Sequence, residues 1–184
     1  KTDKVDAFVI AKSLMVEGYT ELKQTDINLL KLKGLCKTRQ NLILMRTRCK
    51  IQLGSFVDQL FPELNQFFRA GLHINVSYTL LKAHPRPAEV QSLHLTYLSN
   101  LLHKASRGRY TKEDAIRLRE LAKISIGTDS PALALQIRQA VSQIELFSAQ
   151  LEQVESEISS IMNSLASPIM TIPGIGHLNG AMIL

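Results

Sequence analysis

The sequence predicts an all-α protein: a long antiparallel helical hairpin, or coiled coil, with a small helical subdomain at its tip. Residues 25–60 contain no proline and carry recurring apolar positions, and residues 131–165 keep a heptad repeat. Between them, prolines and glycine turns interrupt residues 62–130, as expected of several short helices. Two helices of similar length can therefore lie side by side, joined by the middle segment.

The first element predicted is a helix that Thr2 or Asp3 can cap and that Gly18 stops. A connector over residues 19–24 leads into the long helix, which ends before Pro62. The apolar residues expected on one face of this long helix are Leu35, Leu42, Met45, Cys49 and Phe56.

The middle segment predicts short helices over residues 78–82 and 95–104, with a turn at 107–109. Thr111 then caps a further helix, and Asp114 three residues later completes a capping box. Arg107, Arg109 and Lys112 form a small basic cluster beside this cap.

The last long helix begins after Pro131, a residue suited to the first turn of a helix. Its apolar residues alternate at spacings of four and three, which is an a/d heptad pattern about 50 Å long at 1.5 Å per residue. The partner must be equally long, and it is either the 25–60 helix or the same helix of a second copy. The repeat consists of Leu133, Ile137, Ala140, Ile144, Phe147, Leu151, Val154, Ile158, Ile161 and Leu165.

Charge is distributed unevenly within a net charge of +6. The first long helix is basic, whereas the second carries Arg138 as its one base against glutamates at 145, 152, 155 and 157. These glutamates are expected to face the basic helix across the seam. The basic series is either a nucleic-acid surface or a solvated, salt-bridged face, and it consists of Lys31, Lys33, Lys37, Arg39, Arg46, Arg48 and Lys50.

Composition limits the class of protein. Apolar residues make up 45% of the 184 and charged residues 21%, which excludes a disordered tail, and no apolar run is long enough for a membrane span. Cys36 and Cys49 lie about 20 Å apart along one helix, so they cannot pair there, which favours a cytoplasmic protein. The chain lacks an initiator Met and its last residues end without a cap, so we expect it to be truncated at both ends.

Two short motifs could carry chemistry. Asp3 and Asp6 share one side of the first helical turn, where paired carboxylates can hold Mg²⁺ or simply favour a helix N-terminus. The run from Pro173 to Gly176 fits a hairpin whose backbone N–H groups at Gly174 and Gly176 meet a phosphate, or a plain corner between two helices. The histidines and cysteines have no zinc-ligand spacing, and no P-loop or serine-hydrolase motif is present.

Taken in order, these motifs resemble one family. Lys-Thr-Asp-x-x-Asp-Ala opens a helix, a helical insert contains the segments 101–109 and 125–127, and Ile-Pro-Gly-Ile-Gly follows. The sequence resembles, over essentially its whole length, the DEDD transposases of the IS-one-ten (IS110) type, the bridge-RNA-guided recombinases of bacterial insertion sequences.

The resemblance implies a RuvC-like domain with four metal-binding acids, a coiled-coil insert for dimer or tetramer assembly, and a C-terminal domain with a nucleophilic serine. Asp3 and Asp6 match the last two acids, which implies Mg²⁺ in the intact protein but none tightly bound here. The first two acids are expected before Lys1 and the serine beyond Leu184, so the piece alone is expected to be inactive. The implied partners are DNA, a guide RNA and further copies of the chain, without a membrane.

The same resemblance divides the chain. Residues 1–18 are the last helix of the RuvC-like domain, 19–61 the long basic helix, 62–130 the small helical subdomain, 131–166 the heptad helix that mediates oligomerisation, and 167–184 the start of a helix-hairpin-helix transposase domain. The alternative is a non-enzymatic coiled-coil assembly or nucleic-acid-binding protein, in which the two aspartates only cap a helix.

Overall fold

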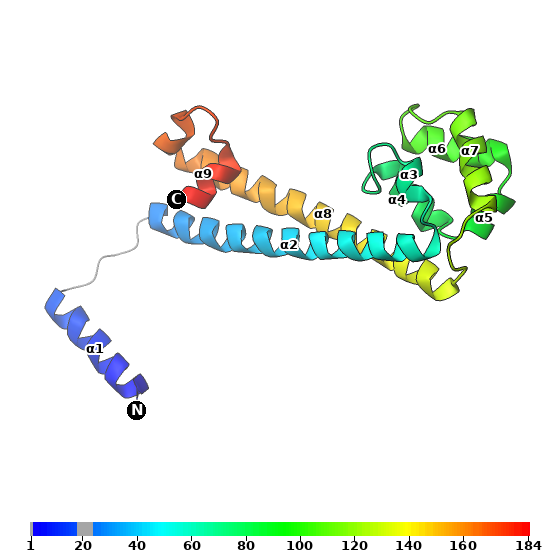
Figure 1. Ribbon diagram of the computed structural model, residues 1–184. Helices are drawn as coiled ribbons and strands as arrows, with labels where there is room; N and C mark the ends of the chain where they lie inside the picture. Colours follow the sequence, from blue (N-terminus) through cyan, green and yellow to red (C-terminus); the bar gives the residue numbers. More distant parts are fainter. Residues whose placement is uncertain (1, 18–23) are drawn as a thin grey trace. The chain divides into compact units, whose positions relative to one another are not determined.

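The computed structural model describes residues 2–17 and 24–184, and all regular structure in these ranges is helical. The all-α prediction is therefore confirmed. The chain forms two compact units: residues 38–154 make one, and residues 1–37 together with 155–184 make the other. Two long helices, α2 (Gln24–Leu60) and α8 (Pro131–Leu165), contribute to both units (Figure 1).

Within the unit of residues 38–154, α2 and α8 form an antiparallel hairpin, as predicted. Cys49 Sγ donates to Gln143 Oε1 at 3.3 Å, and Arg46 Nη1 donates to Ser148 Oγ at 3.5 Å. The residue number falls along α2 while it rises along α8, which is the antiparallel sense. Apolar side chains at 0–1% exposure fill the seam, namely Leu53, Val57, Ile137, Val141 and Ile144.

The predicted inner face of α2 was wrong in part. Met45 is 49% exposed, while Leu53 and Val57 are fully buried. The seam follows the spacing 39, 42, 46, 49, 53, and two of these positions are half-buried arginines, Arg39 and Arg46. Because those arginines interrupt the apolar pattern, the predicted inner face is rotated slightly around the helix from the observed one.

A small helical subdomain closes the hairpin, and its helices α4, α6 and α7 agree with the predicted segments. Two helices were not predicted: α3 is a single turn, and α5 begins at Pro87, which the sequence indicated as a break but which suits a first helical position. The helices are α3 (Leu64–Phe67), α4 (Asn75–Ala83), α5 (Pro87–Ser92), α6 (Leu95–Ala105) and α7 (Lys112–Lys123). α7 packs on α5 and α6, and α6 packs on α4, around a fully buried core of Leu80, Leu81, Leu98, Leu102 and Leu118.

Hydrogen bonds fix the start of α7 and the loop before α8. At α7, the backbone N–H of Thr111 donates to Asp114 Oδ2 at 2.8 Å, which confirms the predicted capping box. Before α8, Ser125 Oγ and the backbone N–H of Ile126 donate to the carboxylate of Glu63, at 2.6 and 3.0 Å. The loop that leads into α8 is thereby tied to the N-cap of α3, just after α2.

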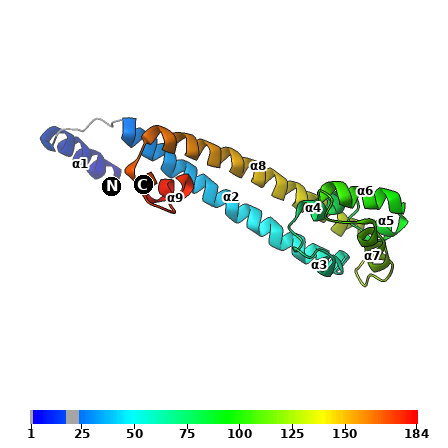
Figure 2. The ribbon, with the colours of Figure 1, turned by 90° about the horizontal axis from the view of Figure 1, so that it is seen from above.

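The second unit holds the start of α2, the end of α8, the 3₁₀ helix η1 (Pro168–Thr171) and α9 (His177–Ile183), which Figure 2 shows from above. Leu32, Ile158 and Met162 are at most 1% exposed and form its centre. Gly180 of α9 packs so closely that an added Cβ would lie 3.0 Å from Met162 Cε and 3.1 Å from Met170 Sδ.

The first helix, α1 (Thr2–Glu17), has the predicted extent. Its apolar side chains are largely exposed, with Phe8 at 69%, Ile10 at 60% and Val5 at 59%. Among the residues described, no helix combines the length and the apolar character that crossing a membrane requires.

Candidate nucleic-acid interface

Asp3 and Asp6 lie one helical turn apart in the first two turns of α1, and both are exposed. The spacing lets the two carboxylates approach one ion. Within residues 2–17 and 24–184, however, no group of three potential ligands among His, Cys, Asp and Glu comes together. Two carboxylates alone do not make the shell of a tightly bound Mg²⁺, so the described residues supply an incomplete set.

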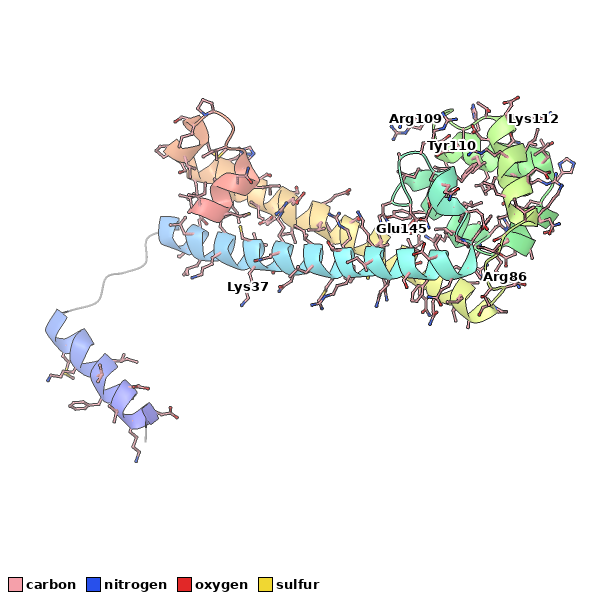
Figure 3. All side chains as sticks on the ribbon, viewed as in Figure 1. Lys37, Arg86, Arg109, Tyr110, Lys112 and Glu145 are labelled. Carbon is pink, nitrogen blue, oxygen red and sulfur yellow. The ribbon has the colours of Figure 1, made fainter. Side chains whose placement is uncertain are left out.

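The basic series of α2 divides into two groups by exposure. Lys31, Lys33, Lys37 and Arg48 are exposed. Lys33 and Lys37 are four residues apart, so they occupy one face of the helix, and Lys37 projects freely from α2 in Figure 3. These four side chains are available to a phosphate backbone.

Arg39, Arg46 and Lys50 are half-buried instead. Arg46 is turned toward α8, where it contacts Ser148, and Arg39 is also engaged within the chain. The structure therefore brings together only part of the predicted basic surface.

The glutamates of α8 do not all face the basic helix, contrary to the prediction. Glu145, which Figure 3 labels, pairs with Lys82 of α4, and both side chains are about half exposed, at 45% and 51%. Glu152 and Glu157 are exposed. Lys82 lies in the subdomain, so the periodicity of the two long helices could not identify it as the partner of Glu145.

The heptad residues of α8 are turned into the chain. Ile137, Ala140, Ile144, Leu151 and Ile158 are at most 4% exposed, and the rest of the predicted set is half-buried: Leu133, Phe147, Val154, Ile161 and Leu165. A second copy could reach the five buried side chains only if the hairpin opened.

The segment around Gly174 and Gly176 forms a turn between η1 and α9, and both glycines are exposed. Gly174 has φ of +87°, a conformation that favours glycine, and Gly176 is the N-cap of α9. The element before the turn is a single 3₁₀ turn rather than a full α-helix. The turn itself is present as predicted, while its contact with phosphate stays a prediction.

A cavity of about 500 Å³ in the subdomain was not identified from the sequence. It lies between the turn that follows α3 and the turn that joins α6 to α7, and arginines at 69, 107 and 109 line it beside Tyr110. The cluster around Arg107 and Arg109 was the available signal. Arg69 and the apolar wall come from segments that only folding brings there.

Burial raises the pKa of Tyr110 above its usual value of 10.0, and the negative charge of Asp114 raises it further. A backbone hydrogen bond with Arg69 and the charge of that side chain oppose the rise. Tyr110 is therefore a neutral phenol at physiological pH, able to form hydrogen bonds or to contact a flat ring.

A scan of known families matches residues 1–62 to the DEDD transposase family of the IS110 type, described as a transposase. The matched segment covers α1 and α2, including both aspartates and the whole basic series. The motifs at 101–109, 125–127 and 173–176 lie beyond it. No match was found among curated proteins or among solved structures. Over residues 1–62 the chain is thus similar to the DEDD transposases of the IS110 type, which supports the predicted resemblance for that segment.

Proposed function

We propose that this chain is the nucleic-acid-binding and assembly segment of a DNA transposase that mobilises an insertion sequence by site-specific recombination. The observation that carries the proposal is the family match over residues 1–62, which contains both the acidic pair and the basic helix. DNA is the primary partner and a guide RNA the second. A recombinase of bacterial DNA works in the cytoplasm.

In this proposal, Asp3 and Asp6 contribute two of the carboxylates of a Mg²⁺ site, and the remaining ligands lie outside the described residues. The exposed apolar side chains of α1, such as Phe8 and Val5, then pack against the domain that supplies those ligands. Bound Mg²⁺ would supply charge neutralisation at a scissile phosphate. The chain by itself has an incomplete active site, binds Mg²⁺ weakly and cleaves no DNA.

Assembly into a dimer or tetramer uses the hairpin. Since Ile137, Ile144 and Leu151 pack within the chain, the closed hairpin must present other residues to a second copy. Leu44 and Ile51 are 52% and 68% exposed and lie one heptad apart on α2, as expected of residues that share a helix face. The predicted heptad set then acts indirectly, by holding the hairpin that displays this face.

The nucleic-acid role is tested by duplex DNA binding measured across salt concentrations. Replacing Lys33 and Lys37 by glutamine should weaken binding and lower the slope of log K against log salt by about 1 for each phosphate that is no longer neutralised. The matched control replaces Lys12 and Arg117 by glutamine. Both residues are exposed, and replacing them removes the same amount of positive charge elsewhere in the chain. Equal weakening in both variants, or no salt-dependent binding at all, would contradict the proposed interface.

The catalytic role is tested in the intact transposase. Asp3→Asn combined with Asp6→Asn should abolish Mg²⁺-dependent strand exchange while leaving duplex binding within about twofold of the unmodified protein, because the carboxylates hold metal rather than DNA backbone. Full strand exchange by the double variant would show that both aspartates only cap the helix.

A further inference from the structure

We propose that the cavity of the small subdomain binds one unstacked nucleotide of a single-stranded nucleic acid. The site lies between the α3–α4 turn and the α6–α7 turn, and it is separate from the basic residues of α2. It shares with the proposed function only the premise that the protein binds nucleic acid.

The cationic side of the cavity is built by the turn from Ser106 to Tyr110. Gly108 N–H donates to the carbonyl of His103 at 2.8 Å, and Ser106 Oγ accepts from the N–H of Tyr110 at 3.0 Å. Arg107 and Gly108 have φ of +55° and +85°, so the chain reverses sharply and presents Arg107 and Arg109 from either side of the glycine. Figure 3 shows Arg109 and Tyr110 on this turn. The hydrogen-bonded turn fixes the backbone from which both arginines line the cavity.

The lining of the cavity carries more positive than negative charge. Arg69, Arg107 and Arg109 take part in none of the ion pairs formed within the described ranges. The one carboxylate in the lining, Asp114, already accepts from the backbone of Thr111 in the α7 cap. Three arginines around one engaged carboxylate favour an anion, and a guanidinium can grip a phosphate with two parallel hydrogen bonds.

Apolar side chains also line the cavity, namely Ile74, Val76 and Ala105. Asn75 ties the start of α4 to the end of α6 because its Nδ2 donates to the Ala105 carbonyl at 2.9 Å. Tyr110 also lines the space, and its ring is held by Phe67 and Phe68 at centroid distances of 5.6 and 6.0 Å. A rigid ring and aliphatic side chains next to arginines suit a ligand with one flat apolar end and one anionic end.

A nucleotide has this division, with the base against the apolar wall and the phosphate among the arginines. The cavity volume of about 500 Å³ falls within the range of about 300–1,000 Å³ typical of small-ligand pockets. Bases enter such pockets when they are free of a duplex, since stacking on aromatic rings and guanidinium planes requires an unstacked base. The cavity therefore selects single strands over duplexes.

The test uses the whole chain and fluorescein-labelled oligouridylate, oligothymidylate and a duplex of equal length, with binding followed by fluorescence anisotropy. Arg107→Gln combined with Arg109→Gln should weaken single-strand binding at least about tenfold, the effect of removing one charge-assisted hydrogen bond, and change duplex binding less than about twofold. Arg69→Gln, on the other wall, should also weaken single-strand binding, and its effect should not add to that of the double variant because all three groups hold one phosphate. Either oligonucleotide, RNA or DNA, supports the site if these variants no longer bind it.

The control is again Lys12→Gln with Arg117→Gln, which should leave single-strand binding within about twofold. All substituted arginines are exposed, so thermal unfolding followed by circular dichroism should be unchanged in every variant. The inference is overturned if the unmodified chain binds no single strand, if the control weakens binding as much as the cavity variants, or if duplex binding falls equally. The two proposals can fail separately. If the Lys33 and Lys37 variant binds duplex more weakly while the cavity variants bind single strands normally, the cavity is not a nucleotide site but the proposed function still holds.

Discussion

Adding a single methyl group at Gly127 should destabilise the hairpin more than at any other described glycine. It lies where the loop before α8 passes the end of α2, and a Cβ there would stand 2.0 Å from the carbonyl oxygen of Leu60 and 2.5 Å from its carbonyl carbon. Both atoms are backbone, so no side chain can rotate away. In Gly127→Ala the loop must move outward by roughly 1 Å or more to restore ordinary van der Waals separation.

The movement acts on hydrogen bonds as well as on packing. Thr128 N–H donates to the Gln59 carbonyl at 2.8 Å, and Ile126 N–H donates to Glu63 at 3.0 Å, so both bonds flank the displaced residue. Overpacking costs about 1–3 kcal/mol, and each hydrogen bond broken or stretched costs about 0.5–1.5 kcal/mol. We therefore expect Gly127→Ala to lower the free energy of unfolding by about 2–6 kcal/mol.

Urea unfolding followed by circular dichroism at 222 nm measures this decrease. Gly54→Ala is the matched control, because Gly54 lies inside α2 with nothing within 4 Å of an added Cβ. Alanine there should stabilise the chain by up to about 1 kcal/mol through helix propensity, so the same substitution should have opposite signs at the two sites. A Gly127→Ala protein as stable as the unmodified chain would show that the loop does not pass α2 this closely.

Three further results are expected. Ile144→Ala should cost about 2–5 kcal/mol in urea unfolding because Ile144 is 1% exposed, whereas Leu146→Ala, at a side chain 53% exposed, should cost less than about 1 kcal/mol; equal costs would mean that α8 faces another way. Leu44→Glu should lower the mass observed by sedimentation without changing unfolding, and an unchanged mass would remove the outer face of α2 from assembly. Burial and the charge of Lys50 lower the pKa of His73 below 6.5, so the unfolded chain takes up a proton first as the pH falls, and the free energy of unfolding should decrease below about pH 6.5. His73→Gln should flatten this pH dependence of stability. An unaltered pH dependence in the variant would show that other groups cause it.

The extent of the helices was predictable because their signals are local. The heptad repeat after Pro131 and the Thr111 capping box depend on residues within one or two turns, and both appear in the structure with the expected bounds. The family resemblance was equally local, since Asp3, Asp6 and the helix after them lie in the matched segment.

What failed depended on contacts between distant segments. The partner of Glu145 is Lys82, 63 residues away on a short helix, and no spacing within α8 could indicate it. The cavity joins Arg69 to Tyr110 across two turns that meet only after α4 and α6 have packed. Short turns show little periodicity. The sequence therefore indicated a basic cluster that contains the arginines at 107 and 109, but not the pocket that they line.

The polar residues of the seam favour pairing of α8 with α2 of its own chain. Arg46 meets Ser148 and Cys49 meets Gln143, so each polar side chain at the apolar interface has a partner of different chemistry on the other helix. In a pair of α8 helices, the polar residues available would again be Ser148 and Gln143, and no cation would stand opposite them. Single polar positions are known to fix the register and partner of coiled coils. The arginines that obscured the apolar face of α2 therefore favour closure of the hairpin within one chain.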